Sequence, residues 1–410
     1  MTMKKIITIS VLVIVVALSI WLIFFRTGSV SIPESLGGSP FGSGEDISIP
    51  AGDFGEDTTG QETSFDQTTP EAKIFRIANT PVAGFVVLTK GADSVVRYVD
   101  RATGHIFDFP LPKAGQGGAE KVRVTNNTLP KIYEAYFRSD GNAVLLRSLD
   151  NDSDVINNIS LALTAPRATT TGELYGVSSS NLRGDIDSLV AGTGDTLFYV
   201  LKDARAIVSS SFTGASQKTI FSSNFDNWRL SRAGSNLLIY TKSKTGVSGY
   251  AYTLNTVSGA LTKVAGPQDA LTATANSLGT RLIYSYLDSG QTKSVTKNLQ
   301  NNSTLEILPS TLAEKCIWST KQTDVVYCGV PAIAMGKNEP DGWYQGRTFF
   351  SDKLWSFDTK SEIAQVVSEP KAEFDLDLDI SEPKLSPSED YLVFVNKRDL
   401  TLWAIKLVLQ

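Results

Sequence analysis

A turn of five residues recurs seven times between residues 89 and 390, and each copy is followed by a short apolar stretch. The copies are rich in Gly, Asp, Ser and Asn, the residues that tight turns favour. They read TKGAD (89–93), RSDGN (138–142), GTGDT (192–196), RAGSN (232–236), NSLGT (276–280), TKQTD (320–324) and SPSED (386–390). The stretches that follow are β-branched and aromatic, which predicts repeated hairpins and an all-β domain.

Successive turns lie 40 or more residues apart, enough chain for a four-stranded antiparallel unit. Units of this kind gain from radial arrangement, because a closed ring protects the sheet edges that an open array would expose. We therefore predict an all-β fold, a seven-bladed β-propeller of four-stranded antiparallel blades over residues 73–410. Eight blades, if 148–190 contains a further one, six blades, and a pair of β-sandwiches are the alternatives.

The two ends of this domain are expected to meet. The last repeat stops at Leu407 after only three strands, whereas the apolar stretch KIFRIA (73–78) precedes the first repeat without a partner of its own. We predict that 73–78 supplies the fourth, outer strand of the last blade.

Residues 6–25 form an uncharged and almost wholly apolar run, which as a helix covers the roughly 30 Å hydrocarbon core of a membrane. Lys4 and Lys5 precede it and only Arg26 follows, so the cationic bias predicts a cytoplasmic N-terminus. The alternative is a cleaved signal peptide, but its apolar core is shorter and ends at small residues, whereas this run ends in WLIFF. We expect residues 1–26 to be a signal anchor, with the propeller in the periplasm or at the cell surface.

Residues 27–72 are rich in Gly, Ser, Pro and Thr and contain nine acidic residues and no Lys or Arg. Such a segment cannot bury enough apolar surface to fold, so we predict a disordered linker. The part from residue 73 onward is close to neutral. Because phosphate binding requires a basic excess, nucleic acid is not an expected partner.

Several stretches resemble a known family. SPSEDYLVF (386–394) is similar to the S-P-D-G-x-x-L-x-F element of TolB-like and WD40-like propeller repeats, and RSDGNAVLL, RAGSNLLIY and SLGTRLIYS are looser versions. RYVDRATGHI, KCIWS, YCGVP, DGWYQG and FSDKLW resemble bacterial membrane-anchored propellers of the same kind. The resemblance covers roughly residues 72–410 and implies a binding or scaffolding protein, with no catalytic residues to carry over.

Cys316 and Cys328 are the only cysteines, and they flank the turn 320–324. With Gln322 at the centre of the hairpin, the two residues oppose each other directly, close enough for a disulfide in a narrow pair. An exported domain also sees an oxidising compartment. A structural disulfide is therefore expected, the alternative being two buried free thiols.

The sixth repeat carries an insertion between its second and third strands, over residues 329–353. In a propeller this connection lies on the face where ligands commonly bind. Trp, Tyr and Arg dominate binding hot spots, and the insertion supplies the candidate binding residues Asp341, Trp343, Tyr344, Arg347, Phe349 and Phe350. The alternative is a loop that folds back, plugs the ring or covers a neighbouring blade, and buries its own aromatics.

The remaining polar motifs predict no chemistry. Asp150, Asp152 and Asp154 imitate the start of a calcium loop, but Val155 stands where that loop needs Gly. The alternating acids of EFDLDLDI (373–380) fit a strand with one wet face. His105 is the sole histidine, and no G-x-S-x-G elbow accompanies it. We therefore expect no metal, no cofactor and no enzymatic activity.

Two functions remain open at this stage. The first is a non-catalytic scaffold of the cell envelope that binds a protein through the insertion. The alternative is a propeller that binds cell-wall glycan, and acts on it if acids from separate blades come together. A sensory ectodomain is a third reading, but so short a cytoplasmic segment would need a partner to relay any signal.

Overall fold

The computed structural model describes residues 72–113, 120–150, 155–166, 174–225 and 227–407. Regular structure in these ranges is almost entirely β-strand, and every strand pairing is antiparallel, which confirms the all-β prediction. The described part of the chain has no helix with the length and apolar character needed to cross a bilayer. The span predicted at residues 6–25 and the linker up to residue 71 lie outside the described residues.

The described strands form five four-stranded sheets and one seven-stranded sheet. Four sheets consist of consecutive strands: β2 (Val82–Lys90), β3 (Asp93–Asp100), β4 (Ile106–Pro110), β5 (Val122–Arg123); β6 (Ile132–Phe137), β7 (Ala143–Leu149), β8 (Ile156–Thr164), β9 (Gly176–Leu182); β10 (Ile186–Ala191), β11 (Thr196–Leu201), β12 (Ala206–Ser211), β13 (Lys218–Ser222); and β21 (Cys316–Trp318), β22 (Val325–Pro331), β23 (Asp352–Asp358), β24 (Ile363–Ser368).

The seven-stranded sheet runs through β14 (Trp228–Ala233), β15 (Asn236–Thr241), β16 (Ser248–Leu254), β17 (Leu261–Ala275), β18 (Arg281–Asp288), β19 (Gln291–Asn298) and β20 (Thr304–Ile307). Its middle strand β17 is 15 residues long. The first part of β17 pairs with β16 and the last part with β18, and the register shifts in both ladders. One continuous strand therefore joins two four-stranded units.

The fifth four-stranded sheet closes the ring and has the order β1 (Ile74–Ala78), β27 (Leu402–Lys406), β26 (Tyr391–Asn396), β25 (Ile380–Leu385). The first strand of the domain pairs with the last one, with Ile74 opposite Ile405 and Phe75 opposite Ala404. The sequence-based prediction that 73–78 completes the final sheet is confirmed. Both ends of the described chain are thus held in one sheet.

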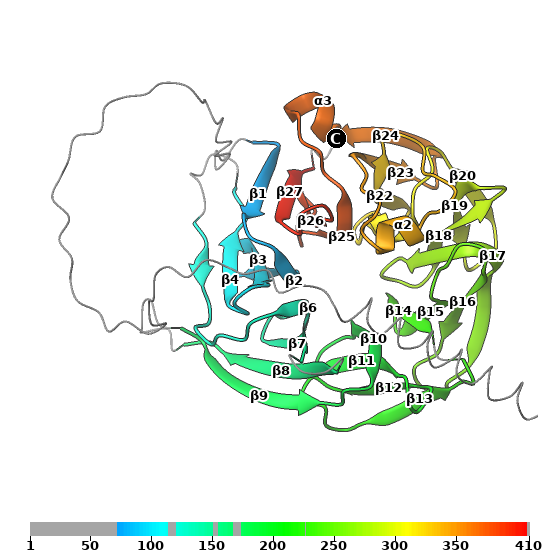
Figure 1. Cartoon of the computed structure of the whole chain (residues 1–410). Coiled ribbons are helices and arrows are strands. Elements are labelled where there is room, and N and C mark those ends of the chain that lie inside the picture. The colour runs from blue at the N-terminus through cyan, green and yellow to red at the C-terminus, as the bar shows by residue number, and fades with distance from the viewer. Residues whose placement is uncertain (1–71, 114–119, 151–154, 167–173, 226, 408–410) are drawn as a thin grey trace, which may run out of the picture. The chain divides into compact units, whose positions relative to one another are not determined.

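Figure 1 shows the sheets following one another around a ring, with β2, β6, β10, β14 and β25 nearest the centre and β9, β13, β20 and β24 at the periphery. Apolar side chains fill the space between neighbouring sheets. Leu145 of β7 packs with Leu197 and Tyr199 of β11, and Ile283 of β18 packs with Trp318 of β21. In the described residues the core therefore lies between successive four-stranded units, including the two units that β17 joins.

The topology gives the ring two distinct faces. Four antiparallel strands bring the chain back to the side on which it started, so the first strand of every sheet begins on the same face. The connection between a second and a third strand lies on that face too. The link from β22 to β23 is such a connection, and we call this side the insertion face. The turns between first and second strands, and between third and fourth strands, lie on the opposite face.

Two of the turns, RSDGN and SPSED, differ in how they accommodate a positive φ at their fourth residue. Gly141 of RSDGN has a positive φ of 72°, and a Cβ there would lie 2.5 Å from the side chain of Leu88. In SPSED the corresponding position is Glu389, also at positive φ. Its buried carboxylate accepts hydrogen bonds from Ser319 Oγ at 2.5 Å and Thr320 N at 2.6 Å. Contacts to the neighbouring sheet thus offset the strain that Gly would avoid.

The strand predicted over 373–380 is wrong. Pro370–Phe374 form the short helix α3, and residues 375–379 have no regular structure before β25 begins. Pro at the first helical position starts α3, and Asp375 ends it in the left-handed conformation. The alternation of wet acids and apolar residues also fails at Asp379, which is fully buried. The other helical elements of the described ranges are η1 (Ala313–Lys315) and α2 (Asp341–Tyr344).

Candidate functional site

The insertion on the insertion face runs from β22 to β23 and contains α2. It reaches well beyond its own sheet. Asp341 Oδ2 accepts a hydrogen bond from Thr245 N, after β15, at 3.2 Å. At its other end the Phe350 carbonyl accepts one from Arg398 Nε, after β26, at 3.4 Å. The insertion therefore bridges sheets on both sides of the one that carries it.

A fully buried lysine anchors this segment. Lys315 Nζ lies 2.7 Å from Asp352 Oδ2 and 2.5 Å from Asp379 Oδ1, and all three side chains have no exposed surface. Lys315 belongs to η1, Asp352 opens β23 and Asp379 immediately precedes β25. One cation thus joins two sheets, and its two carboxylates are held close together in a region of low polarity.

The insertion closes over this ion cluster with its aromatic residues. The indole Nε1 of Trp343 donates to Asp379 at 3.1 Å, and the backbone N of Phe350 donates to Asp379 Oδ2 at 2.9 Å. Lys315 Nζ lies 5.0 Å from the centre of the Trp343 ring and 5.1 Å from that of Phe350. Leu312 packs with both rings. The aromatics therefore shield the buried charges from water and orient the loop.

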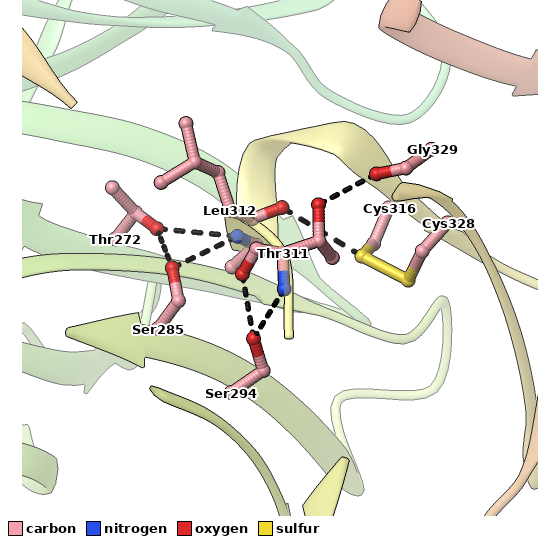
Figure 2. Close-up of a disulfide and its surroundings, with 9 residues drawn as sticks. Thr272, Ser285, Ser294, Thr311, Leu312, Cys316, Cys328 and Gly329 are labelled. Atoms are coloured by element: carbon pink, nitrogen blue, oxygen red, sulfur yellow. Dashed lines mark hydrogen bonds between the residues drawn. A yellow bond between two sulfur atoms is a disulfide. The ribbon is translucent and has the colours of Figure 1, made fainter. Parts of the chain in front are cut away.

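Buried hydroxyl groups fix the segment that presents Lys315 (Figure 2). Ser294 Oγ donates to the carbonyl of Thr311 at 2.6 Å and accepts from its N at 2.8 Å, while Thr311 Oγ1 donates to the carbonyl of Gly329 at 2.5 Å. Two further hydroxyls, Thr272 Oγ1 and Ser285 Oγ, accept from the backbone N of Ala313. These bonds tie η1 to the sheets on either side.

The cysteines flank the same element. Cys316 is directly opposite Cys328 in the β21–β22 ladder, which confirms the register predicted from the turn, and their sulfurs are bonded (Figure 2). The disulfide joins the residue after Lys315 to the strand that leads into the insertion. Closing so short a loop stabilises the fold by about 2 to 3 kcal/mol in the loop-entropy description.

One member of the buried cluster, Asp352, has a raised pKa. Burial raises the pKa of Asp352 to about 6, Lys315 opposes this rise, and Asp379 adds to it. Asp352 Oδ2 accepts from Ile380 N at 2.7 Å, whereas Oδ1 has no hydrogen-bond partner among the described residues. A buried acceptor without a donor favours the protonated acid.

Stability is therefore expected to rise as the pH falls through 6. The folded pKa of Asp352 lies above its usual value of 3.8, so the folded state binds this proton more tightly than the unfolded state. The stabilisation is fully present below about pH 4 and is lost as the pH rises through about 6, on the order of 3 kcal/mol in all. Comparing the Tm of wild type and Asp352→Asn at pH 5 and pH 7.5 measures it.

Asp358→Asn is the matched control at the other end of β23. Hydrogen bonds, the largest of them from Ser361, lower the pKa of Asp358, so its contribution has the opposite sign and is lost in acid. If Asp352→Asn leaves the change in Tm between the two pH values as in wild type, Asp352 does not titrate in this range.

A second group of charges lies at the start of the innermost strands, on the insertion face. These ring-centre acids are Glu134 in β6, Asp187 in β10, Glu314 in η1 and Glu382 in β25. Three of them have close partners: Arg147 lies 2.7 Å from Glu134, Arg229 lies 3.5 Å from Asp187, and the Tyr240 hydroxyl donates to Glu314 at 2.7 Å.

One ring-centre acid acts on another, and one acts on the insertion. Desolvation by the surrounding protein raises the pKa of Glu382 although water reaches its side chain, and Glu134 adds to the rise. Burial likewise raises the pKa of Tyr344 well above its usual value, and Glu314 contributes to that shift. The insertion therefore extends from the buried Lys315 cluster to the acids at the centre of the ring.

The six candidate residues of the insertion fall into three classes of burial. Trp343 and Phe350 are buried, Asp341 and Tyr344 are half-buried, and Arg347 and Phe349 are exposed. The buried aromatics fit a loop that folds back onto the protein, whereas the exposed residues fit a binding surface. Ile333, at the start of the insertion, is 83% exposed, although no aromatic or charged pattern marks it as a candidate. Its apolar neighbours Ala332 and Ala334, also exposed, were the available signal.

The other sequence motifs lie apart from this site. His105 forms a hydrogen bond with Thr128 Oγ1 at 3.1 Å and lies beside Arg123, and burial followed by that cation lowers its pKa. Asp152 and Asp154 lie outside the described residues. Among the residues that are described, no group of three or more His, Cys, Asp or Glu side chains is placed to hold a metal ion.

No model of a protein family matches the chain, and no curated protein matches it either. Solved structures do. The WD40 repeats of RRP9 superpose with a TM-score of 0.51 at 12% identity, covering 83% of this chain and 99% of that one. An oligogalacturonate lyase from Vibrio parahaemolyticus gives 0.51 at 11% identity, over 82% and 92% of the two chains. The fold is a β-propeller.

This confirms, at the level of the fold, the resemblance to TolB-like and WD40-like propellers. TolB from Acinetobacter baumannii is itself a distant match, with a TM-score of 0.35 at 12% identity over 78% of each chain. At such identities likeness of fold says nothing about activity, because unrelated functions share this architecture. The function must be argued from the propeller's own residues.

Proposed function

We propose that the protein is a non-catalytic propeller of seven blades, anchored in a membrane, that binds a protein partner of the cell envelope through its insertion. The single observation that carries this proposal is the combination of a firmly anchored loop with exposed apolar and cationic side chains. The seven-stranded sheet counts as two blades in this proposal, since β17 serves as the outer strand of one and the inner strand of the next.

The exposed side chains have the character of a binding surface. Ile333 is 83% exposed and Phe349 40% exposed, and Arg347 is also open to solvent. These side chains are displayed on a loop whose inner side buried ion pairs hold in place. Pre-organisation of this kind lowers the entropy that a partner must overcome on binding.

The proposed location outside the cytoplasm has two supports. Residues 6–25 are long and apolar enough for a membrane anchor, preceded by Lys4 and Lys5. The bonded pair Cys316–Cys328 is also typical of domains that mature in an oxidising compartment. The acidic segment 27–72 would then act as the linker between anchor and propeller.

Substitutions on the insertion are expected to abolish partner binding. We would crosslink the tagged full chain in its native envelope and identify captured proteins by mass spectrometry, for wild type and for Ile333→Asp/Phe349→Asp. The double substitution places charges where apolar contact is needed, so it should lose at least about 90% of the specific capture, a cost of 1.4 kcal/mol or more.

Val257→Asp is the matched control. Val257 is also 83% exposed, but it lies in the turn between β16 and β17, on the opposite face. The Val257→Asp variant should capture the same protein as wild type. The Tm of this control and of Ile333→Asp/Phe349→Asp should equal that of wild type. Equal capture by the insertion variant and the control would refute the proposal.

Binding of cell-wall glycan is the second candidate, and the ring-centre acids favour it. Glu134 and Glu382 come from separate blades, and Glu134 adds to the raised pKa of Glu382; glycosidases use a pair of acids. Retention of wall polysaccharide by wild type, with no protein enriched, would support this alternative and would be tested further with Glu134→Gln and Glu382→Gln.

A further inference from the structure

We infer that the partner presents an acidic segment with apolar side chains, and that this segment docks on a cationic surface formed by Arg347, Phe349, Lys397 and Arg398. The inference rests on the proposed function, since it specifies the kind of protein that the insertion binds. Arg347 and Phe349 belong to the insertion, whereas Lys397 and Arg398 follow β26. The surface is therefore shared between two blades.

The two halves of the cationic surface are in contact. The link from β26 to β27 joins a second to a third strand, which puts it on the insertion face. The Arg398 guanidinium lies 5.9 Å from the centre of the Phe349 ring, and Lys397 Nζ lies 5.1 Å from that of Trp343. Trp343 is the residue that fixes the insertion to Asp379. The buried anchor thus holds the cations in register with the loop.

The cations of this surface form no ion pairs with the described residues, although Lys397 acts on the ring-centre acid Glu382 and opposes the rise of its pKa. Among the described residues, no carboxylate oxygen lies within 4.0 Å of the side-chain nitrogens of Arg347, Lys397 or Arg398. Some surface carboxylates have lysine partners: Lys353 lies 2.9 Å from Glu369, and Lys371 is shared by Asp375 at 2.8 Å and Asp377 at 2.9 Å. The hydrogen bond from Lys371 is the largest cause of the lowered pKa of Asp377, and Arg398 is a smaller one.

The chemistry of these groups selects the occupant. A guanidinium presents forked donors that fit a carboxylate in two parallel hydrogen bonds. Phe349 adds an exposed aromatic ring, and its cation–π contact with Arg398 keeps the two side chains close together. A polyanion without apolar groups would use the charges and leave the ring in water. An acidic segment with Leu or Phe between its carboxylates would satisfy both.

Binding of a designed peptide tests this inference on the purified full chain. The probe is a fluorescent peptide in which Glu alternates with Leu and Phe, and anisotropy gives its Kd at low and at physiological salt. We expect Arg347→Glu/Arg398→Glu to weaken binding at least about tenfold, because like charges would then face each other. Added salt should weaken the wild-type complex as well, since the charges are exposed.

Two controls sharpen the test. Lys360→Glu reverses an exposed cation of the same blade in the turn between β23 and β24, on the opposite face, and should bind the peptide as wild type does. The same peptide with Lys in place of Glu should not bind. Unchanged affinity in Arg347→Glu/Arg398→Glu overturns the inference. Competition by polygalacturonate at equal carboxylate concentration also overturns it, because the ligand would then be an anionic glycan.

Repeating the envelope capture separates this inference from the function on which it rests. A protein that Arg347→Glu/Arg398→Glu retains and Ile333→Asp/Phe349→Asp loses would leave the protein-binding function standing and remove the acidic partner. A protein lost by both variants and kept by Lys360→Glu supports both. No specific capture by wild type would remove the function itself.

Discussion

Replacing Lys315 by Met is expected to lower the free energy of unfolding by about 3 to 5 kcal/mol at pH 7.5, the cost of leaving a buried charge without its partner. Lys315 is fully buried against Asp352 and Asp379, and no other cationic side chain lies within 4.0 Å of either carboxylate among the described residues. In the variant the two acids would repel each other and take up protons. The loss should therefore be smaller at pH 5 than at pH 7.5, as measured by urea unfolding.

Lys397→Met is the matched control. Its Nζ lies 5.1 Å from the same Trp343 ring that Lys315 Nζ approaches to 5.0 Å, but it is partly exposed and has no close carboxylate among the described residues. Its loss should cost less than about 1 kcal/mol. Because Lys315 fixes the insertion, trypsin should cut Lys315→Met faster than Lys397→Met at the exposed Arg347. Equal stability of the two variants would show that Asp352 and Asp379 do not depend on Lys315.

The repeat pattern was sufficient to predict the ring because it rests on local chemistry. Turn residues such as Gly141 and Gly234 adopt positive φ, and the β-branched stretches after them form the second strands. The closure by 73–78 followed from counting strands at the two ends. The continuity of β17 could not be predicted from the sequence. Gly266 and Pro267 are typical of the end of a strand, but in the structure the pairing with β16 continues past them.

The candidate site was less predictable because its residues are distant in the chain. Lys315, Asp352 and Asp379 each look like an ordinary surface charge, and Asp379 continued an alternation that a strand would explain. These three residues come together as one buried cluster only when the blades pack around the ring. The polar–apolar periodicity of a sequence predicts which face of one strand or helix is solvent-exposed, but it does not predict that another blade covers that face. The same covering buried Trp343 and Phe350 and left Phe349 exposed.

Deleting residues 73–80 from the full chain is expected to remove most of the stability of the propeller. The deletion takes away β1, whose side chains Ile74, Phe75 and Ile77 are all buried. At about 1.5 to 3 kcal/mol for each, the loss amounts to about 5 to 9 kcal/mol, comparable with the whole stability of a typical domain. It also leaves β27 as an open edge, which promotes aggregation through strand pairing.

A synthetic peptide of residues 72–80 makes this prediction testable even if the shortened chain is poorly folded. Added in excess, it should restore the β1–β27 pairing, raise the Tm and suppress aggregation, because a strand bound only to the folded state stabilises that state by mass action. A peptide with Asp at positions 74 and 77 should have no effect, since those side chains enter the core. Full stability of the deleted chain without any peptide would show that the ring does not depend on its first strand for closure.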